Sequence, residues 1–191
     1  YLTNMCDIAL KYGGTIDKFI GDSVMVFFGD PETNGAKEDA AACCDMAMEM
    51  LSFLDKNQQH VQETYNFPEK LEVRVGIHNG LCNVGNFGSA QRLDYTAIGR
   101  AVNVASRLEQ AAPKNSILVS SAVHNLIKNK FETSSQIDVK AKGIDKPIAS
   151  YVLTRKTAVS KKIRKEIDGL KLEYDPQKID RKTLLKFIDE L

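Results

Sequence analysis

The segment DKFIGDSVMVFFGD, residues 17–30, constrains the fold more than any other part of the chain. Its apolar residues form two short strand-like runs, and Gly21 with Asp22 between them is typical of a tight hairpin turn. Lys18 shares one face of the first run with isoleucines two residues away on either side, so this face should be buried. Asp22 is either a turn residue that bonds its own backbone or a functional carboxylate. Lys18 is either an ammonium snorkelling at a sheet edge or a ligand-binding group.

Charge and composition exclude several classes of protein. The 191 residues include 26 Lys and Arg against 25 Asp and Glu, a net charge of +1, so no general attraction to nucleic acid or acidic membranes is expected. No apolar run is long enough to span a bilayer, and the first residues do not resemble a signal peptide. The four cysteines lack zinc-binding spacing. We therefore expect reduced thiols and a cytoplasmic location.

Helical and strand periodicities alternate through the first 155 residues. Besides the hairpin, the sequence predicts helices within residues 2–12, 30–54, 100–112 and 121–129, a loop through Tyr65 and Pro68, and strands within 71–77, 93–99, 116–120, 137–143 and 148–155. Short strands joined partly by hairpins and interrupted by helices indicate an α+β fold, with helices covering one face of a mostly antiparallel sheet. A ferredoxin-like sheet is the leading topology.

The two ends of the chain differ from this core. The chain opens with Tyr1 inside an apparent helix, and we expect a fragment of a longer polypeptide whose preceding strand is missing. We place the main domain at residues 1–156 and a charged linker with a C-terminal amphipathic helix at 157–191. That helix could dock on its own domain or on a partner.

One group of polar residues carries the functional hypothesis. Asn103 and Arg107 stand four residues apart on a predicted helix, so they share a face and can reach one ligand. Such a pair often only faces solvent. Here the preceding strand contains Thr96, and the first hairpin supplies Lys18 and Asp22. A lysine, an aspartate, a threonine, an asparagine and an arginine together are typical of a nucleotide site.

The order and spacing of four segments resemble a class III nucleotidyl cyclase catalytic domain. These segments are GGTIDKFIGDSVMVFFGDP, VRVGIHNGLCNVGNFGS, RLDYTAIGRAVNVASRLE and VKAKGIDKPIASYVL. The similarity extends from Tyr1 to about Arg155. It implies the cyclase fold and an adenylate cyclase that converts ATP to 3',5'-cyclic AMP and pyrophosphate.

The resemblance also implies roles for individual residues. Asp22 corresponds to the second of two aspartates that hold two Mg²⁺ or Mn²⁺ ions against the triphosphate. Lys18 and Thr96 correspond to the pair that recognises the purine and favours ATP over GTP. A threonine at this position is typical of the class IIIb-like subgroup, which is often stimulated by bicarbonate.

The remaining implied residues contact ribose and phosphates. Asn103 would position the ribose, and Arg107 would stabilise the pentavalent phosphorus. Lys142 would bind the terminal phosphates, although Lys140 lies two residues away on the same strand face. Arg92 would have a phosphate-binding or structural role.

Members of this family build each site from two subunits. The resemblance therefore implies a homodimer in which Asp22 of one chain faces the purine-binding residues of the other. It also implies an upstream sensory or membrane region, with the catalytic domain in the cytoplasm. The first metal-binding aspartate would precede residue 1, so the fragment by itself could be inactive. Asp17 is not a substitute for it, because odd spacing places Asp17 opposite Lys18.

One residue departs from the family pattern, and two other functions compete. Arg100 stands where relatives commonly have aspartate, and a basic residue is slightly unfavourable at a helix N-terminus.

The main alternative function is a catalytically inactive cyclase-homology module that binds nucleotide or only dimerises. A ferredoxin-like nucleic-acid-binding domain is the second alternative, disfavoured by the near-neutral charge.

Overall fold

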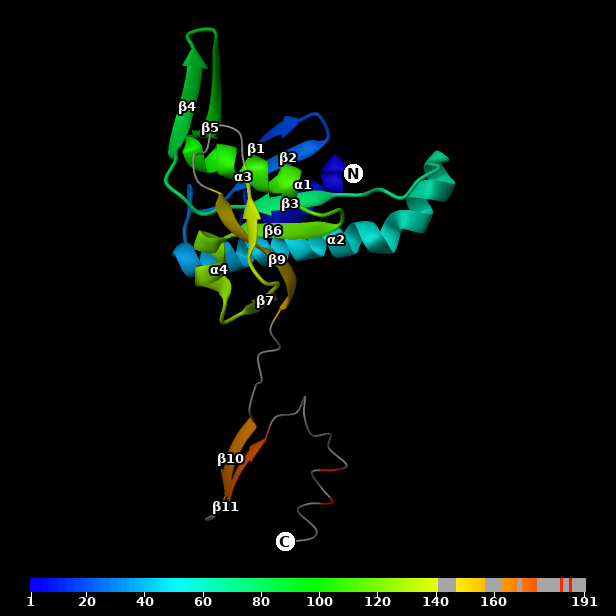
Figure 1. Ribbon diagram of the computed structural model, residues 1–191, viewed down its shortest axis with the longest axis vertical. Helices are drawn as coiled ribbons and strands as arrows, with labels where there is room; N and C mark the ends of the chain where they lie inside the picture. Colours follow the sequence, from blue (N-terminus) through cyan, green and yellow to red (C-terminus); the bar gives the residue numbers. More distant parts are fainter. Residues whose placement is uncertain (141–146, 157–162, 168–169, 175–182, 184–185, 187–191) are drawn as a thin grey trace. The chain divides into compact units, whose positions relative to one another are not determined.

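The computed structural model describes residues 1–140, 147–156, 163–167, 170–174, 183 and 186. The chain divides into two units, Tyr1–Lys156 and Thr157–Leu191, which are described separately. Figure 1 shows the elements of the first unit: α1 (Leu2–Lys11), β1 (Thr15–Ile20), β2 (Ser23–Phe27), α2 (Ala36–Tyr65), β3 (Arg74–Ile77), β4 (Asn83–Ser89), β5 (Arg92–Ile98), α3 (Arg100–Ala111), β6 (Ser116–Ser120), α4 (Ser121–Ile127), β7 (Phe131–Thr133), β8 (Ile137–Val139) and β9 (Ile148–Lys156).

The central sheet has the strand order β3-β6-β9-β7, and β8 also pairs with β9. β3 and β6 run parallel, whereas β9 is antiparallel to β6, β7 and β8. The predicted α+β fold with a mostly antiparallel sheet is therefore confirmed. β6 lies at the centre, and its last four residues are buried because both faces of this strand are covered.

Helices cover both faces of the sheet, so the prediction of a single covered face is wrong. Ile117 and Val119 of β6 pack with α2 and α4 in one apolar cluster. Leu118, between them, packs with Val104 and Leu108 of α3 in another cluster. Side chains alternate across a strand, which places α3 on the face opposite α2 and α4.

Two hairpins lie outside the central sheet. The hairpin β1–β2 packs with α1 and α2 in a third apolar cluster. The hairpin β4–β5 projects from the body of the first unit, as Figure 1 shows, and its paired residues run from Asn83 with Ile98 to Ser89 with Arg92. β4 was not predicted as a strand, and neither was the short strand β7.

Two further segments differ from the sequence prediction. The helix α2 continues to Tyr65, where a loop was expected, and ends at Asn66 in a left-handed conformation with φ 50°. In the second unit, β10 (Ile163–Ile167) and β11 (Leu170–Tyr174) form an antiparallel hairpin where a linker was expected. The predicted C-terminal helix lies outside the described residues, apart from Thr183 and Lys186.

No helix among the described residues is both long enough and apolar enough to cross a membrane.

Gly76 in β3 sets the distance between α3 and the sheet. A Cβ atom at this position would lie 2.1 Å from the backbone nitrogen of Glu109 and 2.4 Å from the carbonyl oxygen of Ala105. Both atoms belong to the backbone of α3, so no side-chain rotation can relieve the overlap. The absence of a side chain at Gly76 therefore allows α3 to lie directly on β3.

We predict that Gly76→Ala lowers the free energy of unfolding by about 3 kcal/mol, because the added methyl group forces α3 away from the sheet. Urea denaturation at fixed protein concentration measures this change. Gly85→Ala is the matched control, because a Cβ there would meet only a Phe87 ring carbon at 3.9 Å. Equal denaturation midpoints for the two variants would contradict the assigned role of Gly76.

Candidate functional site

Asp22 lies at the tip of the hairpin β1–β2. Ile20 pairs with Ser23, so Gly21 and Asp22 form a two-residue loop, as predicted. Gly21 has φ +64°, a backbone conformation that glycine adopts without a steric penalty. Asp22 is exposed, and its charge adds to the effect of burial in raising the pKa of the Tyr1 phenol. Its carboxylate is therefore free to face a ligand.

The strand β1 contains a bulge at Asp17. Ile16 pairs with Val26 and Lys18 pairs with Met25, which leaves Asp17 without a cross-strand partner. A bulge breaks the alternation of side chains. The prediction that Asp17 lies opposite Lys18 is therefore wrong, because the Lys18 ammonium lies 3.3 Å from Asp17 Oδ1. The expected burial of the Lys18 face is also wrong, since 45% of the Lys18 side chain is exposed.

The carboxylate of Asp17 joins the hairpin β1–β2 to β5. Its side chain is 0% exposed. The Thr96 hydroxyl donates to it, at 2.8 Å from Oδ1 and 2.9 Å from Oδ2. The backbone N–H of Ala97 donates to Oδ2 at 2.8 Å. The two predicted purine-binding residues, Lys18 and Thr96, are thus brought together by a third residue that they share.

The helix α3 begins directly after β5 and carries the next two predicted residues. Asn103 is exposed, whereas Arg107 is partly buried and donates a hydrogen bond to Gln110 Oε1 at 2.9 Å. Val104 and Leu108 lie on the buried side of the same helix. The helix therefore holds Asn103 and Arg107 on its more exposed side, one turn apart.

The other predicted phosphate-binding residues are not placed in this group. Lys142 lies outside the described residues, and Lys140 is exposed after the end of β8. Arg92 starts β5 at the tip of the hairpin β4–β5, and its Nε lies 3.4 Å from Asp94 Oδ2. With 83% of its side chain exposed, Arg92 makes a local ion pair at the tip of the hairpin.

A hollow of about 360 Å³ lies between the end of β3, the start of α3 and the start of β9. His78, Arg100, Val104 and Ile148 are among the residues that line it. The His78 Nδ1 atom lies 2.9 Å from the buried Ser120 hydroxyl. Burial, and to a lesser extent the positive charge of Arg100, lowers the pKa of His78.

The described residues contain no group of three or more His, Cys, Asp or Glu side chains that could hold a metal ion. Asp22 offers one exposed carboxylate, a suitable oxygen ligand for a small divalent cation. Its predicted role as a metal ligand stays a prediction.

Sequence reasoning missed the role of Asp17 and gave no role to His78. An acidic residue inside an apolar strand could have drawn attention to Asp17, but its partners on β5 lie 79 and 80 positions away. For His78 the sequence gives no comparable indication, because its neighbours Ser120 and Arg100 come from two other elements.

The chain belongs to the adenylate and guanylate cyclase catalytic domain family, whose sequence profile matches residues 3–155. This match confirms the resemblance inferred from the four sequence segments. Because the family includes both kinds of cyclase, membership does not define the base.

Curated relatives of both kinds share part of their length with this chain. An adenylate cyclase of Anabaena cylindrica is 36% identical over 156 residues, which are 79% of this chain and 30% of that protein. Adenylate cyclase 1 of Rhizobium meliloti is 34% identical over 147 residues, 75% of this chain and 21% of that protein. The receptor-type guanylate cyclase gcy-23 of Caenorhabditis elegans is 33% identical over 162 residues, 81% of this chain and 14% of that protein. The chain thus spans less than a third of each relative.

Solved cyclase structures have the same fold. The adenylyl cyclase CyaB from P. aeruginosa is 47% identical with a TM-score of 0.78, covering 81% of this chain and 78% of that one. The guanylyl cyclase Cya2 is 28% identical with a TM-score of 0.76, covering 84% of this chain and 80% of that one. The predicted cyclase fold is therefore confirmed.

We predict that His78 titrates below its usual pKa of about 6.5 and that Arg100→Ala raises this pKa without restoring the usual value, because burial is the larger cause. NMR titration of the imidazole signals measures both values. The His78 pKa is therefore higher in the unfolded chain than in the folded one, and the unfolded chain takes up the proton at a higher pH. The free energy of unfolding should consequently fall as the pH decreases below about 6.5. Arg74→Ala, which removes another exposed arginine, is the control and should leave the His78 pKa unchanged. An equal shift in both variants would contradict this assignment.

Proposed function

We propose that the chain is the catalytic domain of an adenylate cyclase that converts ATP to 3',5'-cyclic AMP and pyrophosphate. The observation that carries this proposal is the Lys18 and Thr96 pair, held together by the Asp17 carboxylate directly before the helix that bears Asn103 and Arg107. The 47% identity with a solved adenylyl cyclase supports the same activity. The inactive cyclase-homology module is the competing function that the experiment below can establish.

Base recognition follows from hydrogen-bond polarity. The Lys18 ammonium has only donors and can donate to adenine N1. The Thr96 hydroxyl can accept from the exocyclic amine of adenine. Guanine has a donor at N1 and an acceptor at position 6, which is the opposite pattern. The pair therefore favours ATP over GTP.

The residues of α3 would act on the ribose and the reacting phosphate. Asn103 would orient the ribose, so that its 3'-oxygen lies in line with the α-phosphorus. The planar guanidinium of Arg107 would donate to the phosphate oxygens as negative charge develops there. Lys142 would bind the terminal phosphates. These residues would make the α-phosphorus more electrophilic and would hold the pyrophosphate as it leaves.

We propose that Asp22 supplies one carboxylate ligand for Mg²⁺ or Mn²⁺, two ions per site. Such ions would help to deprotonate the 3'-hydroxyl and neutralise charge on the phosphates. A cytoplasmic location for the catalytic domain and an upstream sensory or membrane region belong to the same proposal. The free state of the four cysteines among the described residues is consistent with a reducing compartment.

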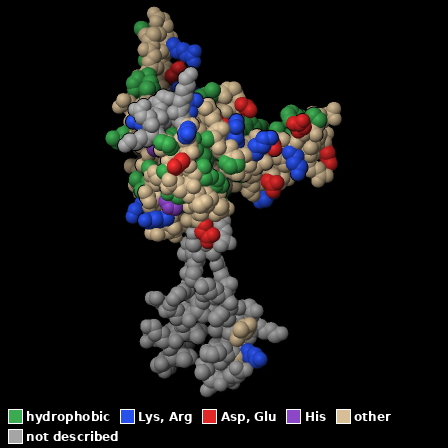
Figure 2. All heavy atoms as spheres, in the orientation of Figure 1, with side chains coloured by type: hydrophobic (Ala, Val, Ile, Leu, Met, Phe, Trp, Pro, Cys, Tyr) green, Lys and Arg blue, Asp and Glu red, His purple; other side chains and the backbone are tan. Residues whose placement is uncertain are grey.

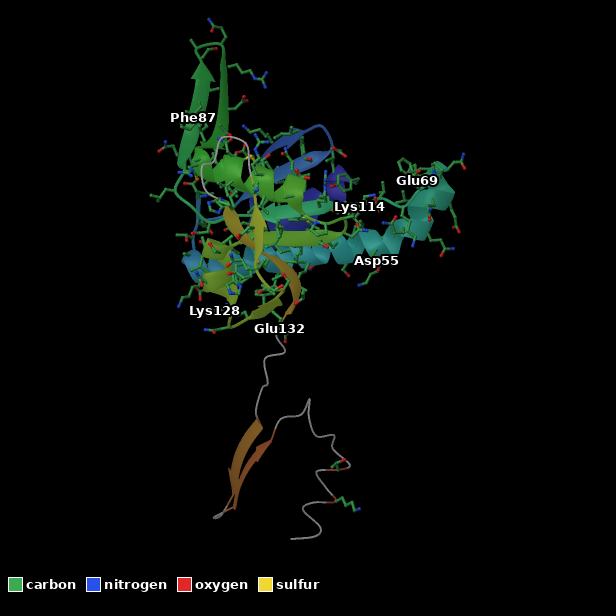
Figure 3. All side chains as sticks on the ribbon, viewed as in Figure 1. Asp55, Glu69, Phe87, Lys114, Lys128 and Glu132 are labelled. Carbon is green, nitrogen blue, oxygen red and sulfur yellow. The ribbon has the colours of Figure 1, made fainter. Side chains whose placement is uncertain are left out.

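The hairpin β4–β5 supports a homodimer. Hydrophobic side chains are visible along it in Figure 2, and Figure 3 labels Phe87 on it. The exposed large apolar residues of this region are Leu81 (98%), Phe87 (36%), Leu93 (63%), Tyr95 (45%) and Ile98 (46%). Apolar surface of this extent on a projecting hairpin is typical of a protein interface. We propose that two copies pair here and form two equivalent sites.

We predict that Asp22→Ala and Arg107→Ala each lower cyclic AMP production by the full-length protein at least about 100-fold. Co-expression of the two variants should restore about a quarter of the wild-type rate of cyclic AMP production. Random pairing gives one half heterodimers, and each heterodimer has one intact site because both substitutions fall in the other site. The measurement is cyclic AMP formed from ATP with Mg²⁺ or Mn²⁺, after the variants are co-expressed.

The matched control is a mixture of Lys18→Ala and Arg107→Ala, which should not recover, because these residues belong to the same half of each site. Recovery in this control, or none in the first mixture, would exclude the shared site. Wild-type protein that binds ATP but forms no cyclic nucleotide under any condition would support the inactive module instead.

A further inference from the structure

The buried carboxylate of Asp17 does more than join two strands. Both of its oxygens face groups that can only donate: the backbone N–H of Ala97 lies 2.8 Å from Oδ2, and the Lys18 ammonium lies 3.3 Å from Oδ1. An ionised carboxylate accepts from both donors and has no hydrogen to donate to Thr96. The Thr96 hydroxyl must donate to Asp17, at 2.8 and 2.9 Å.

This donation fixes the direction of the Thr96 hydroxyl. A hydroxyl has one hydrogen and two acceptor lone pairs, and the hydrogen normally rotates to suit its partner. Thr96 is 5% exposed, so water has little access to the group. Its other acceptor among the described residues is the carbonyl oxygen of Ala97, at the longer distance of 3.5 Å. With the hydrogen directed at Asp17, only acceptor lone pairs remain for a ligand.

We propose that Asp17 is a positioning residue that determines purine specificity by keeping Thr96 an acceptor and Lys18 beside it. An acceptor at Thr96 suits the 6-amino group of adenine and opposes the 6-oxo group of guanine or hypoxanthine. The inference rests on the proposed nucleotide site. In that site, a carboxylate that need not contact the substrate would determine which groups donate and which accept hydrogen bonds.

Asp17→Asn tests the proposal because it preserves the shape of the side chain. The amide oxygen can still accept from Ala97, and the amide nitrogen can then donate to Thr96. The Thr96 hydrogen would be released to donate to a ligand, which suits a 6-oxo group. Asp17→Ala instead leaves the hydroxyl free to adopt either direction.

The substrates are ATP and inosine triphosphate, which differ only at position 6 and N1 of the purine. The measured quantity is the ratio of kcat/KM for ATP to that for inosine triphosphate, in the full-length protein. We expect this ratio to fall about tenfold or more in Asp17→Asn, and less in Asp17→Ala. A purely structural role predicts the reverse order, because alanine removes more contacts than asparagine does.

Two controls separate this effect from others. Asp94→Asn removes an exposed carboxylate from the same strand, two residues from Thr96, and should keep the wild-type ratio. In a Thr96→Val background, Asp17→Asn should change the ratio less than it does in the wild-type background, because no hydroxyl remains to be directed and only the contact with Lys18 is lost. Thermal unfolding of each variant establishes that the protein folds.

Binding gives a second readout that does not depend on turnover. Calorimetry with the non-cleavable α,β-methylene analogues of ATP and inosine triphosphate should show the same loss of selectivity in Asp17→Asn. Reduced selectivity in binding supports the inference even if the wild-type protein forms no cyclic product, which would defeat only the proposed activity. An unchanged ratio in Asp17→Asn, or an equal change in the Thr96→Val background, would overturn it.

Discussion

The hydrogen bonds and ion pair of the Asp17 carboxylate are the interaction on which the candidate site depends. Through them a residue of the first hairpin is tied to a strand almost 80 positions later. A buried carboxylate is costly unless its oxygens are satisfied, and here donors from Thr96, Ala97 and Lys18 satisfy them. Without this link, Lys18 would lose its ion pair with Asp17, and the Thr96 hydrogen would no longer be directed at a carboxylate.

Packing supplies the second constraint, because the hydrogen-bonded pair must stand next to the helix that carries Asn103 and Arg107. That helix starts two residues after β5 ends and lies on β3, where Gly76 leaves room for its backbone. Its apolar side rests on Leu118 of the central strand. The sheet thus holds the helix, and the hairpin β1–β2 reaches the same region through Asp17. The site is assembled from two parts of the chain that fold around separate apolar clusters.

Structural features that depend on nearby residues could be predicted from the sequence. The turn at Gly21 and Asp22 and the helix α3 depend on nearby residues, and both were predicted. The bulge at Asp17 could not be predicted, because the β5 donors that its carboxylate meets lie 79 and 80 positions away in the sequence. The length of α2 was missed for a similar reason: its polar end has no apolar stripe, but the Gln58 amide bonds both backbone groups of Leu71, at 2.7 and 2.9 Å. The position of α3 on the second face likewise depends on Gly76, whose neighbours Ala105 and Glu109 are distant in sequence.

A crystal structure of the full-length protein with a non-cleavable ATP analogue would show whether Asp17 directs the Thr96 hydroxyl at the bound purine. Thr96 Oγ1 should lie within hydrogen-bond distance of the adenine 6-amino nitrogen and, at the same time, of the Asp17 carboxylate. Lys18 should lie beside adenine N1, and Asp22 of the partner subunit should face the phosphates. An adenine ring bound away from Thr96, or Asp17 turned away from Thr96 in the complex, would contradict this role of Asp17.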